Sequence, residues 1–324
     1  MHAVPLWKKL LKQNFSSIEK LMDFLELDSE NRDKVLLKSS FILNLPIRLA
    51  EKIEKNSLDD PIGRQFIPLK EENKVGEDCK EDPVNDCTFQ LSPKLLQKYQ
   101  SRSLLITTSA CAMHCRYCFR RNYPYETSKS DFDFEIESIK KSFSQKEVIL
   151  SGGDPLSLSN EKLRGLLKEL ESLESIQIIR FHTRFPIGIP ERIDDELIEI
   201  LGGLSKKVVF ILHTNHPKEL DDELKLRLSH LLEKKITLLN QTVLLKGVND
   251  SVNILEELSW KLISLGVLPY YLHQLDPVKG GSHFKVTEEK GKEIISELKK
   301  RVPGYLVPKF VREIPGELSK TIIL

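Results

Sequence analysis

Two patterns of apolar residues divide the chain near residue 100. Before that point, apolar residues recur at the three- and four-residue spacing of amphipathic helices, as in Leu6, Leu10 and Leu11. Residues 1–95 contain no strand-like run, and residues 56–75 have the composition of a loop. The pattern therefore predicts an N-terminal helical region over residues 1–95.

Beyond residue 100, six apolar runs rich in β-forming residues alternate with amphipathic helical stretches. The runs are residues 104–108, 147–151, 177–183, 207–214, 236–245 and 269–275, and the clearest helical stretches are 160–173, 191–201, 221–234 and 251–265. Strands that alternate with helices predict a parallel sheet with right-handed crossovers, and near-continuous apolar strands fit burial on both faces. Six units are fewer than the eight of a closed barrel, so a partial (β/α)6 barrel and an open sheet both satisfy the pattern.

Polar motifs lie on or directly after all six predicted strands. They are the cysteine-rich segment 111–118, the turn 151–155, His182-Thr183-Arg184, His213-Thr214-Asn215-His216, Asn240-Gln241 and His273-Gln274-Leu275-Asp276. Active residues of parallel α/β folds gather at the carboxyl ends of strands. Six motifs on successive strands therefore predict a shared cavity, although ordinary caps and turns would account for some of them, notably His182 and His216.

Composition narrows the class of protein. The chain has 324 residues, 40% of them hydrophobic, which is enough for one large α/β domain or a domain with a smaller companion. Its 49 basic and 48 acidic residues leave a net charge of +1, which indicates neither a nucleic-acid nor a membrane partner. No apolar run reaches membrane-spanning length, residues 1–9 lack a secretory signal, and an odd number of cysteines suits a reducing cytoplasm.

Three of the five cysteines form one dense motif. Cys111, Cys115 and Cys118 are spaced as C-x3-C-x2-C. Thiolates hold iron–sulfur clusters, and three of them leave one iron of a four-iron cluster open to bind a substrate or cofactor. The alternative is a structural zinc site, which normally has four closed ligands and would need a fourth from within the loop or from distant Cys79 or Cys87. We interpret those two as ordinary thiols.

This motif, with Tyr117 before its last cysteine, resembles the C-x3-C-x-aromatic-C signature of radical S-adenosylmethionine (radical SAM) enzymes. The resemblance favours the partial barrel over the open sheet. Over about residues 40–324 the chain resembles the lysine 2,3-aminomutase family, most clearly in residues 111–121, 151–155, 239–245, 269–273 and 304–309. Residues 316–321, Gly-Glu-Leu-Ser-Lys-Thr, are similar to the ending of the short branch that modifies elongation factor P, whereas clostridial-type enzymes continue into a further C-terminal region.

The resemblance implies an isomerase that moves the α-amino group of L-lysine to the β-carbon. The implied cofactors are a [4Fe–4S] cluster, S-adenosylmethionine and pyridoxal 5′-phosphate (PLP), with a one-electron reductant as partner. The reduced cluster cleaves S-adenosylmethionine to a 5′-deoxyadenosyl radical, which takes a hydrogen from lysine C3 while PLP holds the amino group. The enzyme would supply its product, β-lysine, to an elongation factor P ligase.

The resemblance also implies residue roles. Cys111, Cys115 and Cys118 would hold the cluster; Gly152, Gly153, Asp154, His213 and Gln241 would line the S-adenosylmethionine site; Lys320 would bind PLP, with Arg102 near it; Arg120 would hold the substrate carboxylate; and Asp276 and Glu313 would hold its ε-ammonium. His213 could equally be a core histidine, and Arg102 a surface arginine. A lysine that attacks an aldehyde must be neutral, so we expect a buried or cationic setting for Lys320.

The predicted organisation has three parts. These are a helical region (residues 1–95), a radical SAM partial barrel (96–285) and a short C-terminal segment that carries the PLP lysine (286–324). A catabolic or biosynthetic lysine or glutamate 2,3-aminomutase is the rival enzyme, and a structural metal-binding protein is the rival outside enzymes. Paired acids at Asp276 and Glu313 favour lysine over glutamate, although Glu313 stands where the long enzymes have aspartate. Homodimer formation is left open.

Overall fold

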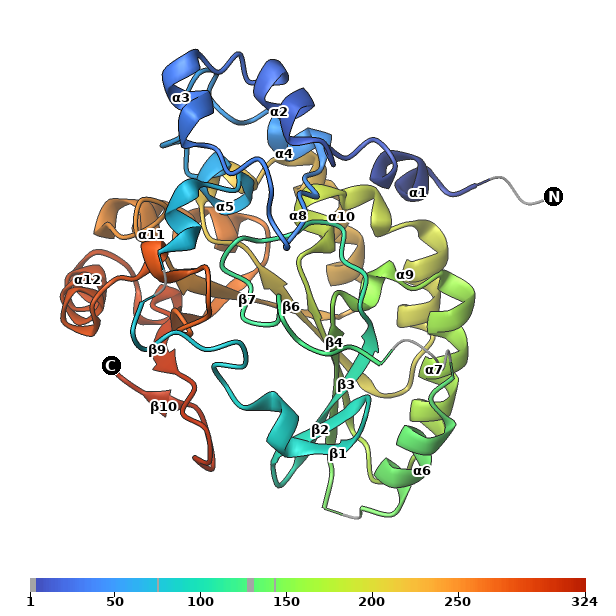
Figure 1. Cartoon of the computed structure of the whole chain (residues 1–324). Helices are drawn as coiled ribbons and strands as arrows, with labels where there is room; N and C mark the ends of the chain where they lie inside the picture. Colours follow the sequence, from blue (N-terminus) through green and yellow to red (C-terminus); the bar gives the residue numbers. More distant parts are fainter. Residues whose placement is uncertain (1–3, 75, 127–130, 143) are drawn as a thin grey trace.

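The chain is built on one sheet of ten strands that hydrogen-bond in sequence order (Figure 1). The computed structural model describes residues 4–74, 76–126, 131–142 and 144–324. Six consecutive strands pair in parallel: β3 (Arg102–Thr108), β4 (Glu147–Gly152), β5 (Ile178–Thr183), β6 (Lys207–His213), β7 (Thr237–Leu244) and β8 (Leu268–Gln274). These are the six strands expected from the apolar runs, and their bounds differ from the prediction by at most two residues.

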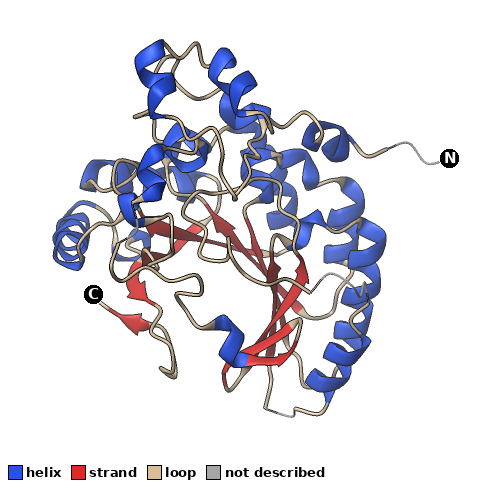
Figure 2. Cartoon of the chain, viewed as in Figure 1, coloured by secondary structure: helices blue, strands red, loops and turns tan. Residues whose placement is uncertain are grey.

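Helices cover the outside of the sheet and return the chain to the same edge each time (Figure 2). They are α6 (Asp133–Lys140), α7 (Asn160–Ser172), α8 (Phe185–Gly188), α9 (Asp195–Gly202), α10 (Asp222–Glu233), α11 (Val252–Ser264) and α12 (Glu288–Arg301). Side chains of Ser159, Asp194 and Asp221 accept a backbone N–H at the starts of α7, α9 and α10, which fixes where each helix begins. Because each crossover is helical, all six parallel strands end at one edge.

The sheet does not close on itself, because its order runs from β1 to β10 without a pairing between them. This is the partial (β/α)6 barrel that the resemblance favoured. Phe181 of β5 and Phe210 of β6 are both fully buried and stack with their ring centroids 4.8 Å apart. Continuous burial along such strands explains why their sequences read as apolar runs rather than alternating ones.

The N-terminal region is helical as expected, with two local corrections. Its helices are α1 (Leu6–Leu11), α2 (Ile18–Phe24), α3 (Ser29–Lys34), α4 (Ile47–Ala50), α5 (Gly63–Phe66) and the 3-10 turns η1 (Lys70–Asn73) and η2 (Asp86–Phe89). The expectation of a loop over residues 56–75 is wrong, because α5 and η1 lie there. The expectation of no strand before residue 95 is also wrong, because β1 (Gln90–Ser92) pairs antiparallel with β2 (Leu95–Tyr99), which pairs antiparallel with β3.

The C-terminal segment adds the other edge of the sheet. After the turn η7 (Gly304–Leu306), β9 (Lys309–Arg312) runs parallel to β8, and β10 (Thr321–Ile322) returns antiparallel to β9. Four further short elements are 3-10 turns: η3 (Pro155–Ser157), η4 (Pro190–Arg192), η5 (Pro217–Glu219) and η6 (Ser282–Phe284). The reversal between β9 and β10 brings Glu313, just after β9, next to Lys320, just before β10.

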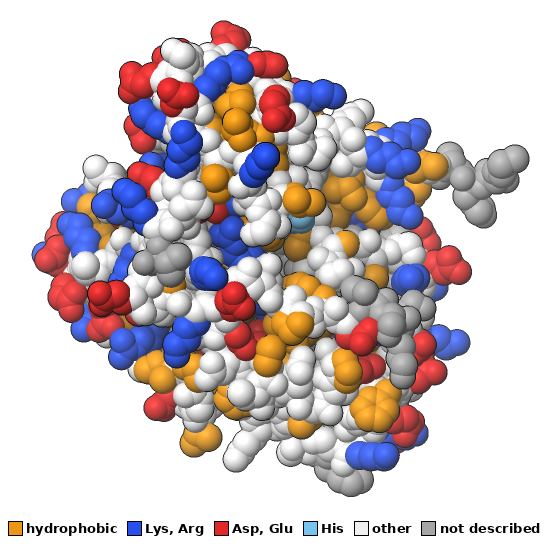
Figure 3. All heavy atoms as spheres, viewed as in Figure 1, with side chains coloured by type: hydrophobic (Ala, Val, Ile, Leu, Met, Phe, Trp, Pro, Cys, Tyr) orange, Lys and Arg blue, Asp and Glu red, His pale blue; other side chains and the backbone are white. Residues whose placement is uncertain are grey.

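The surface carries mixed charge. Acidic and basic side chains intermingle over the face shown in Figure 3, as the near-zero net charge leads one to expect. Within the described ranges, every helix is too short or too polar to cross a bilayer.

Candidate active site

A cavity of about 490 Å³ opens where the parallel strands end and reaches down between them. Its lining includes all thirteen residues named from the sequence: Arg102, Cys111, Cys115, Cys118, Arg120, Gly152, Gly153, Asp154, His213, Gln241, Asp276, Glu313 and Lys320. The structure therefore brings together side chains from β3, β4, β6, β7, β8 and the β9–β10 reversal. One shared cavity is what six polar strand ends predicted.

The cysteine loop (residues 111–118) follows β3, and the N-terminal region holds its backbone. The Asn44 side chain donates to the Cys111 carbonyl at 3.1 Å, and the Asn14 side chain donates to the Ala112 carbonyl at 2.7 Å. The backbone N–H of His114 donates to the Asn44 carbonyl at 2.9 Å. A loop without regular structure has its backbone groups satisfied in this way by residues about 70 to 100 positions away.

Arg116 anchors the centre of the same loop. It is fully buried, and its Nε and Nη2 each lie within 2.7 Å of a Glu72 carboxylate oxygen. Its Nη1 donates to the Phe41 carbonyl at 2.6 Å, and its backbone N–H donates to the Gln65 carbonyl at 2.9 Å. A forked pair of this kind fixes orientation as well as distance. The loop therefore leaves its cysteines, rather than its arginine, facing the cavity.

All three cysteines of the loop are free, partly exposed thiols. Burial, helped by the charges of Asp154 and the neighbouring thiolates, raises the pKa of Cys111 well above its usual range, and burial with the Cys115 thiolate raises the pKa of Cys118 to about 11. Loss of their protons therefore needs a compensating positive charge, which bound iron supplies. In the described part of the chain no set of His, Cys, Asp or Glu converges on a single metal ion. Cysteines of a four-iron cluster bind separate irons and need not converge on one point.

The glycine turn after β4 packs directly on the start of the cysteine loop. Gly153 donates its N–H to the Thr108 carbonyl at 2.7 Å, and Asp154 donates its N–H to the Ala110 carbonyl at 2.8 Å. A Cβ at Gly153 would lie 2.3 Å from the Ala110 oxygen, and Gly152 has a φ of +115°. Both positions thus require glycine, for close approach to protein backbone and for the positive φ.

The Asp154 side chain serves the fold. Its carboxylate accepts hydrogen bonds from the Thr183 hydroxyl and from the backbone N–H groups of Leu156, Arg184 and Phe185. Burial raises its pKa to about 6, although these donors oppose the shift. The carboxylate therefore locks the turns after β4 and β5 together, and only the backbone of the Gly-Gly-Asp turn is left to contact a ligand.

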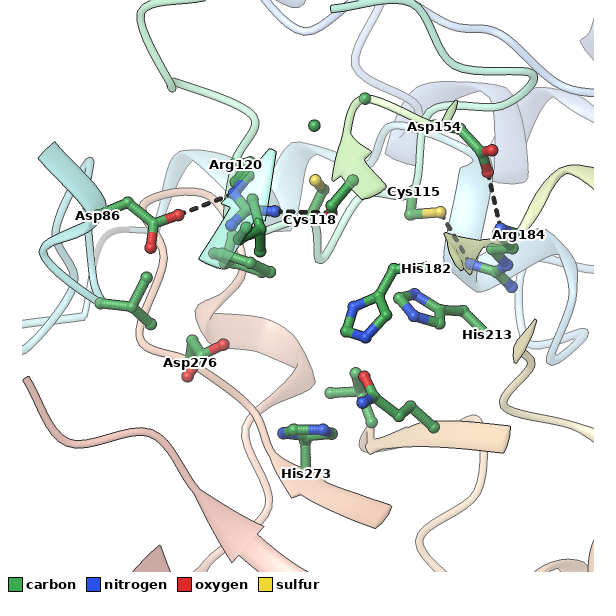
Figure 4. A pocket seen from close by; sticks show the side chains of 18 of the residues that line it. Asp86, Cys115, Cys118, Arg120, Asp154, His182, Arg184, His213, His273 and Asp276 are labelled. Atoms are coloured by element: carbon green, nitrogen blue, oxygen red, sulfur yellow. Dashed lines mark hydrogen bonds and ion pairs between the residues drawn. The ribbon is translucent and has the colours of Figure 1, made fainter. Parts of the chain in front are cut away.

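Three histidines point into the space beside the cysteine loop (Figure 4). His182 of β5, His213 of β6 and His273 of β8 each have an Nε2 that is buried and has no hydrogen-bond partner among the described residues. Burial lowers the pKa of all three, that of His213 to about 3, so they are neutral at pH 7. Buried polar atoms without partners around a cavity indicate a ligand that completes them. Sequence reasoning gave a role only to His213; it placed His182 and His273 in the polar motifs at strand ends without assigning them one.

The two predicted ammonium-binding acids differ in their surroundings. Glu313 accepts hydrogen bonds from Lys320 Nζ at 2.7 Å and from the Tyr99 hydroxyl at 2.9 Å. No described group donates a hydrogen bond to the Asp276 carboxylate, and burial raises its pKa to about 7 despite the nearby Lys320 charge. Asp276 is thus open to a cation. Lys320 has an anionic partner here, rather than the buried or cationic setting expected from the sequence.

Arg120 is oriented by an acid that the sequence did not single out. Its Nε lies 2.8 Å from Asp86 (Figure 4). Its Nη1 donates to the Ser151 hydroxyl at 3.1 Å. Asp86 also pairs with Lys98 at 2.8 Å, and Lys98 lies 3.7 Å from Glu313. Burial would raise the pKa of Asp86, but the charges of Arg120 and Lys98 outweigh it and hold the pKa low. Alternating charges therefore run from Arg120 to Lys320.

The deep end of the cavity is cationic and aromatic. Arg102 lies over the Tyr99 ring, 4.3 Å from its centroid, and the hydroxyls of Tyr270 and Tyr271 are 2.9 Å apart. Arg180 of β5, also in the lining, pairs with Glu147 at 2.9 Å. Such a set of donors suits a phosphate group. Sequence reasoning identified only Arg102 here.

The comparisons with known proteins agree with this geometry. Residues 105–258 match the model of the Radical SAM superfamily. An L-lysine 2,3-aminomutase of Haemophilus influenzae is 38% identical over 98% of this chain and 95% of its own length. The chain belongs to the lysine 2,3-aminomutase family. The Escherichia coli relative of the same description is 38% identical over 97% of this chain and 93% of its own length, and the Clostridium subterminale relative is 34% identical over 98% and 77%.

Membership in this family gives the cavity its chemistry. Radical SAM enzymes use a four-iron cluster with S-adenosylmethionine, and the cavity offers three free thiols beside unpartnered histidines.

Residues that the sequence alone did not reveal, above all Asp86 and Lys98, lie in the segment before β3, where no apolar pattern or motif distinguishes them. Only their spatial position next to Arg120 and Glu313 marks them.

Proposed function

We propose that this protein is a PLP-dependent radical SAM isomerase that converts L-lysine to β-lysine by moving the amino group from C2 to C3. The observation that carries the proposal is one cavity that contains the cysteine loop, the open carboxylate of Asp276 and the lysine Lys320. The relatives described as L-lysine 2,3-aminomutases support it. Removal of a hydrogen from an unactivated carbon is beyond acid–base side chains, and the cofactors supply it when bound.

The chain's own residues would hold each cofactor. Cys111, Cys115 and Cys118 ligate the cluster. The backbone of the glycine turn, with His213 and Gln241, lines the S-adenosylmethionine site. Neutral histidines suit this position because a neutral ring can both donate and accept a hydrogen bond.

Lys320 would hold PLP at the other end of the cavity. Arg102, Arg180 and the nearby tyrosine hydroxyls would hold its phosphate, and Arg180 is a residue that was not named from the sequence. A Lys320 bonded to the cofactor would no longer present an ammonium to Glu313. Glu313 would then be available to the ε-ammonium of the substrate.

The substrate would lie between Arg120 and Asp276. Asp86 holds the Nε of Arg120, so the guanidinium presents its Nη atoms to the α-carboxylate. Asp276 would accept the ε-ammonium, because no described group donates a hydrogen bond to its carboxylate. Glu313 would accept it as well once Lys320 no longer pairs with Glu313. A pair of carboxylates at this end favours lysine over glutamate.

The biological setting belongs to the same proposal. We infer a cytoplasmic enzyme with a one-electron reductant that supplies β-lysine to an elongation factor P ligase, supported by the similarity of residues 316–321 to the short branch. A homodimer is compatible with it. The division into residues 1–95, 96–285 and 286–324 is retained as functional parts, although the first contributes β1 and the last β9 and β10 to the common sheet.

Anaerobic turnover tests the activity. Protein reconstituted with iron and sulfide, then given S-adenosylmethionine, PLP, reductant and L-lysine, should form β-lysine; L-glutamate should not react. A metal-binding protein without catalysis would give no β-lysine and no reductive cleavage of S-adenosylmethionine, and either result alone refutes the proposal.

Borohydride treatment should fix PLP on the peptide that contains Lys320, and Lys320→Ala should abolish this label while its iron content is unchanged. Lys309→Ala, which removes an exposed lysine of β9, is the matched control.

A further inference from the structure

The proposed chemistry gives no role to an arginine that lies next to the cysteine loop. Arg184 lies directly after β5 and is buried, with 6% of its surface exposed. Its Nη1 donates to the Cys115 Sγ at 2.8 Å (Figure 4). The same Nη1 also donates to the Tyr117 hydroxyl. Both acceptors belong to the cysteine loop. A guanidinium charge therefore lies in hydrogen-bond contact with one of the three thiols.

A second group partly neutralises this charge. Arg184 Nη2 lies 2.8 Å from the carboxylate of Glu219, which is fully buried, and donates to the Gln65 side chain at 2.7 Å. Asn215 completes the cluster, since its side chain donates to Gln65 and to Tyr117 at 2.9 and 2.6 Å. Glu219 itself is held by the backbone N–H of Asn215 and by the Gln65 amide. The sulfur thus faces a fixed array of one cation and one anion.

Arg192 shows what a purely structural arginine looks like in this fold. It is also fully buried and follows the same strand. Its guanidinium donates to the carbonyls of Leu156 and Leu158 and to the side chain of Asn160, none of which lies in the cysteine loop. Arg184 differs because its donors are directed at a thiol that lines the cavity.

We propose that Arg184 is a positioning residue that raises the reduction potential of the cluster through Cys115, and that Glu219 partly opposes this effect. The inference rests on the proposed function, because it requires that Cys115 ligate iron. A cluster gains one negative charge when the reductant, which loses one electron, reduces it. An N–H donor to a ligand sulfur and a nearby positive charge stabilise the reduced form and raise the potential. A buried carboxylate behind the arginine lowers it.

The opposite signs of these two effects give the test. Wild type, Arg184→Gln and Glu219→Gln are reconstituted anaerobically, and the cluster is titrated in a potential-controlled cell without substrate, with its reduced form followed by electron paramagnetic resonance. Arg184→Gln should shift the midpoint to more negative potential, and Glu219→Gln to more positive potential. At the wild-type midpoint we expect the ratio of reduced to oxidised cluster to change about tenfold in each direction, which corresponds to about 59 mV for one electron.

Controls separate this role from general damage. Arg192→Gln, the matched buried arginine, should leave the midpoint unchanged in whatever fraction folds, and Arg184→Lys, which keeps the charge but not the fork, should fall between wild type and Arg184→Gln. Shifts of the same sign in Arg184→Gln and Glu219→Gln, or no shift in either, overturn the assignment. If Arg184→Gln does not fold, an unshifted or negative midpoint in Glu219→Gln overturns it alone. Absence of iron uptake by the wild type overturns the proposed function, and this assignment with it.

Discussion

Single carboxylates decide what the cavity can bind. Asp276 and Glu313 are of the same charge class and were assigned one task from the sequence, yet the structure gives them different partners. Glu313 is already held by Lys320 and Tyr99, whereas the half-buried carboxylate of Asp276 has no hydrogen-bond donor among the described residues. A buried acid without a partner is costly unless a ligand supplies one. The substrate ammonium is therefore expected to rely on Asp276 more than on Glu313.

Asp276→Asn should impair lysine turnover severely. Removal of one partner of a buried charge pair costs about 2–5 kcal/mol, which is roughly thirty- to several-thousand-fold in kcat/KM. Glu313→Asp should cost less, since its charge remains. Anaerobic steady-state kinetics measure both, with iron and PLP content as controls for an intact site. Wild-type rates in Asp276→Asn and in Glu313→Gln would show that these acids do not hold the ammonium.

The raised pKa of Asp276 also makes a prediction about stability. Its carboxyl has a pKa of about 7 in the folded protein, against about 3.8 when unfolded. Between these values the folded state binds more protons than the unfolded state, so this group's contribution to the free energy of unfolding grows as pH falls from about 7 to about 4. As the pH is lowered through this window, the melting temperature of Asp276→Asn should rise less, or fall more, than that of wild type. An identical pH dependence of the two melting temperatures would mean that Asp276 titrates normally.

At the scale of elements, the sequence was informative where burial on both faces dictates residue type. Strands β4 and β5 were recognisable because a strand buried on both faces is apolar nearly throughout. Strand β7 buries only every second residue and β8 is mostly half-buried, so their apolar, β-forming composition carried the prediction there. The β1–β2 hairpin was missed because its strands are short and their sequence alternates weakly; they form by pairing with β3, which is tertiary context. The thirteen predicted site residues share one cavity because strand ends converge. Asp86 and Lys98 were missed, and Arg184 was placed at a strand end without a role, because only their contacts distinguish them from ordinary charged residues.

The glycine turn after β4 predicts a local effect on the cluster site. A Cβ in Gly153→Ala would meet the Ala110 carbonyl at 2.3 Å, so the turn or the cysteine loop must move. Overpacking of this kind typically costs about 1–3 kcal/mol. We expect a lower melting temperature and reduced iron per chain after reconstitution. Gly165→Ala is the matched control, because Gly165 of α7 has nothing within 4 Å of a new Cβ and should gain slightly in stability. Equal iron uptake by both variants would contradict the account.

At the scale of the whole molecule, the N-terminal region braces the cysteine loop. Asn14, Asn44 and Gln65 bond the loop's backbone, and Glu72 holds Arg116 at its centre. The same acid also lies 3.1 Å from Arg121, just beyond the loop. These contacts join segments distant in sequence, so the loop reaches its working shape only when the N-terminal region has folded against the barrel. Cluster binding and overall stability should therefore depend on each other.

Glu72→Ala tests this dependence, because it leaves the fully buried Arg116 without its anion. Breaking a buried pair in this way costs about 3–5 kcal/mol, whereas Glu30→Ala, in the exposed pair with Lys34, should cost less than about 1 kcal/mol. Because Glu72 also pairs with Arg121, the triple variant Glu72→Leu, Arg116→Met and Arg121→Met separates two explanations, since apolar replacement of all buried partners often restores stability. If the charge cluster matters only for stability, the triple variant should regain iron along with its melting temperature. If these charges orient the loop, as the forked geometry indicates, the melting temperature should recover while iron per chain stays low. Recovery of both would show that the contacts of Glu72 are not needed to shape the cluster site.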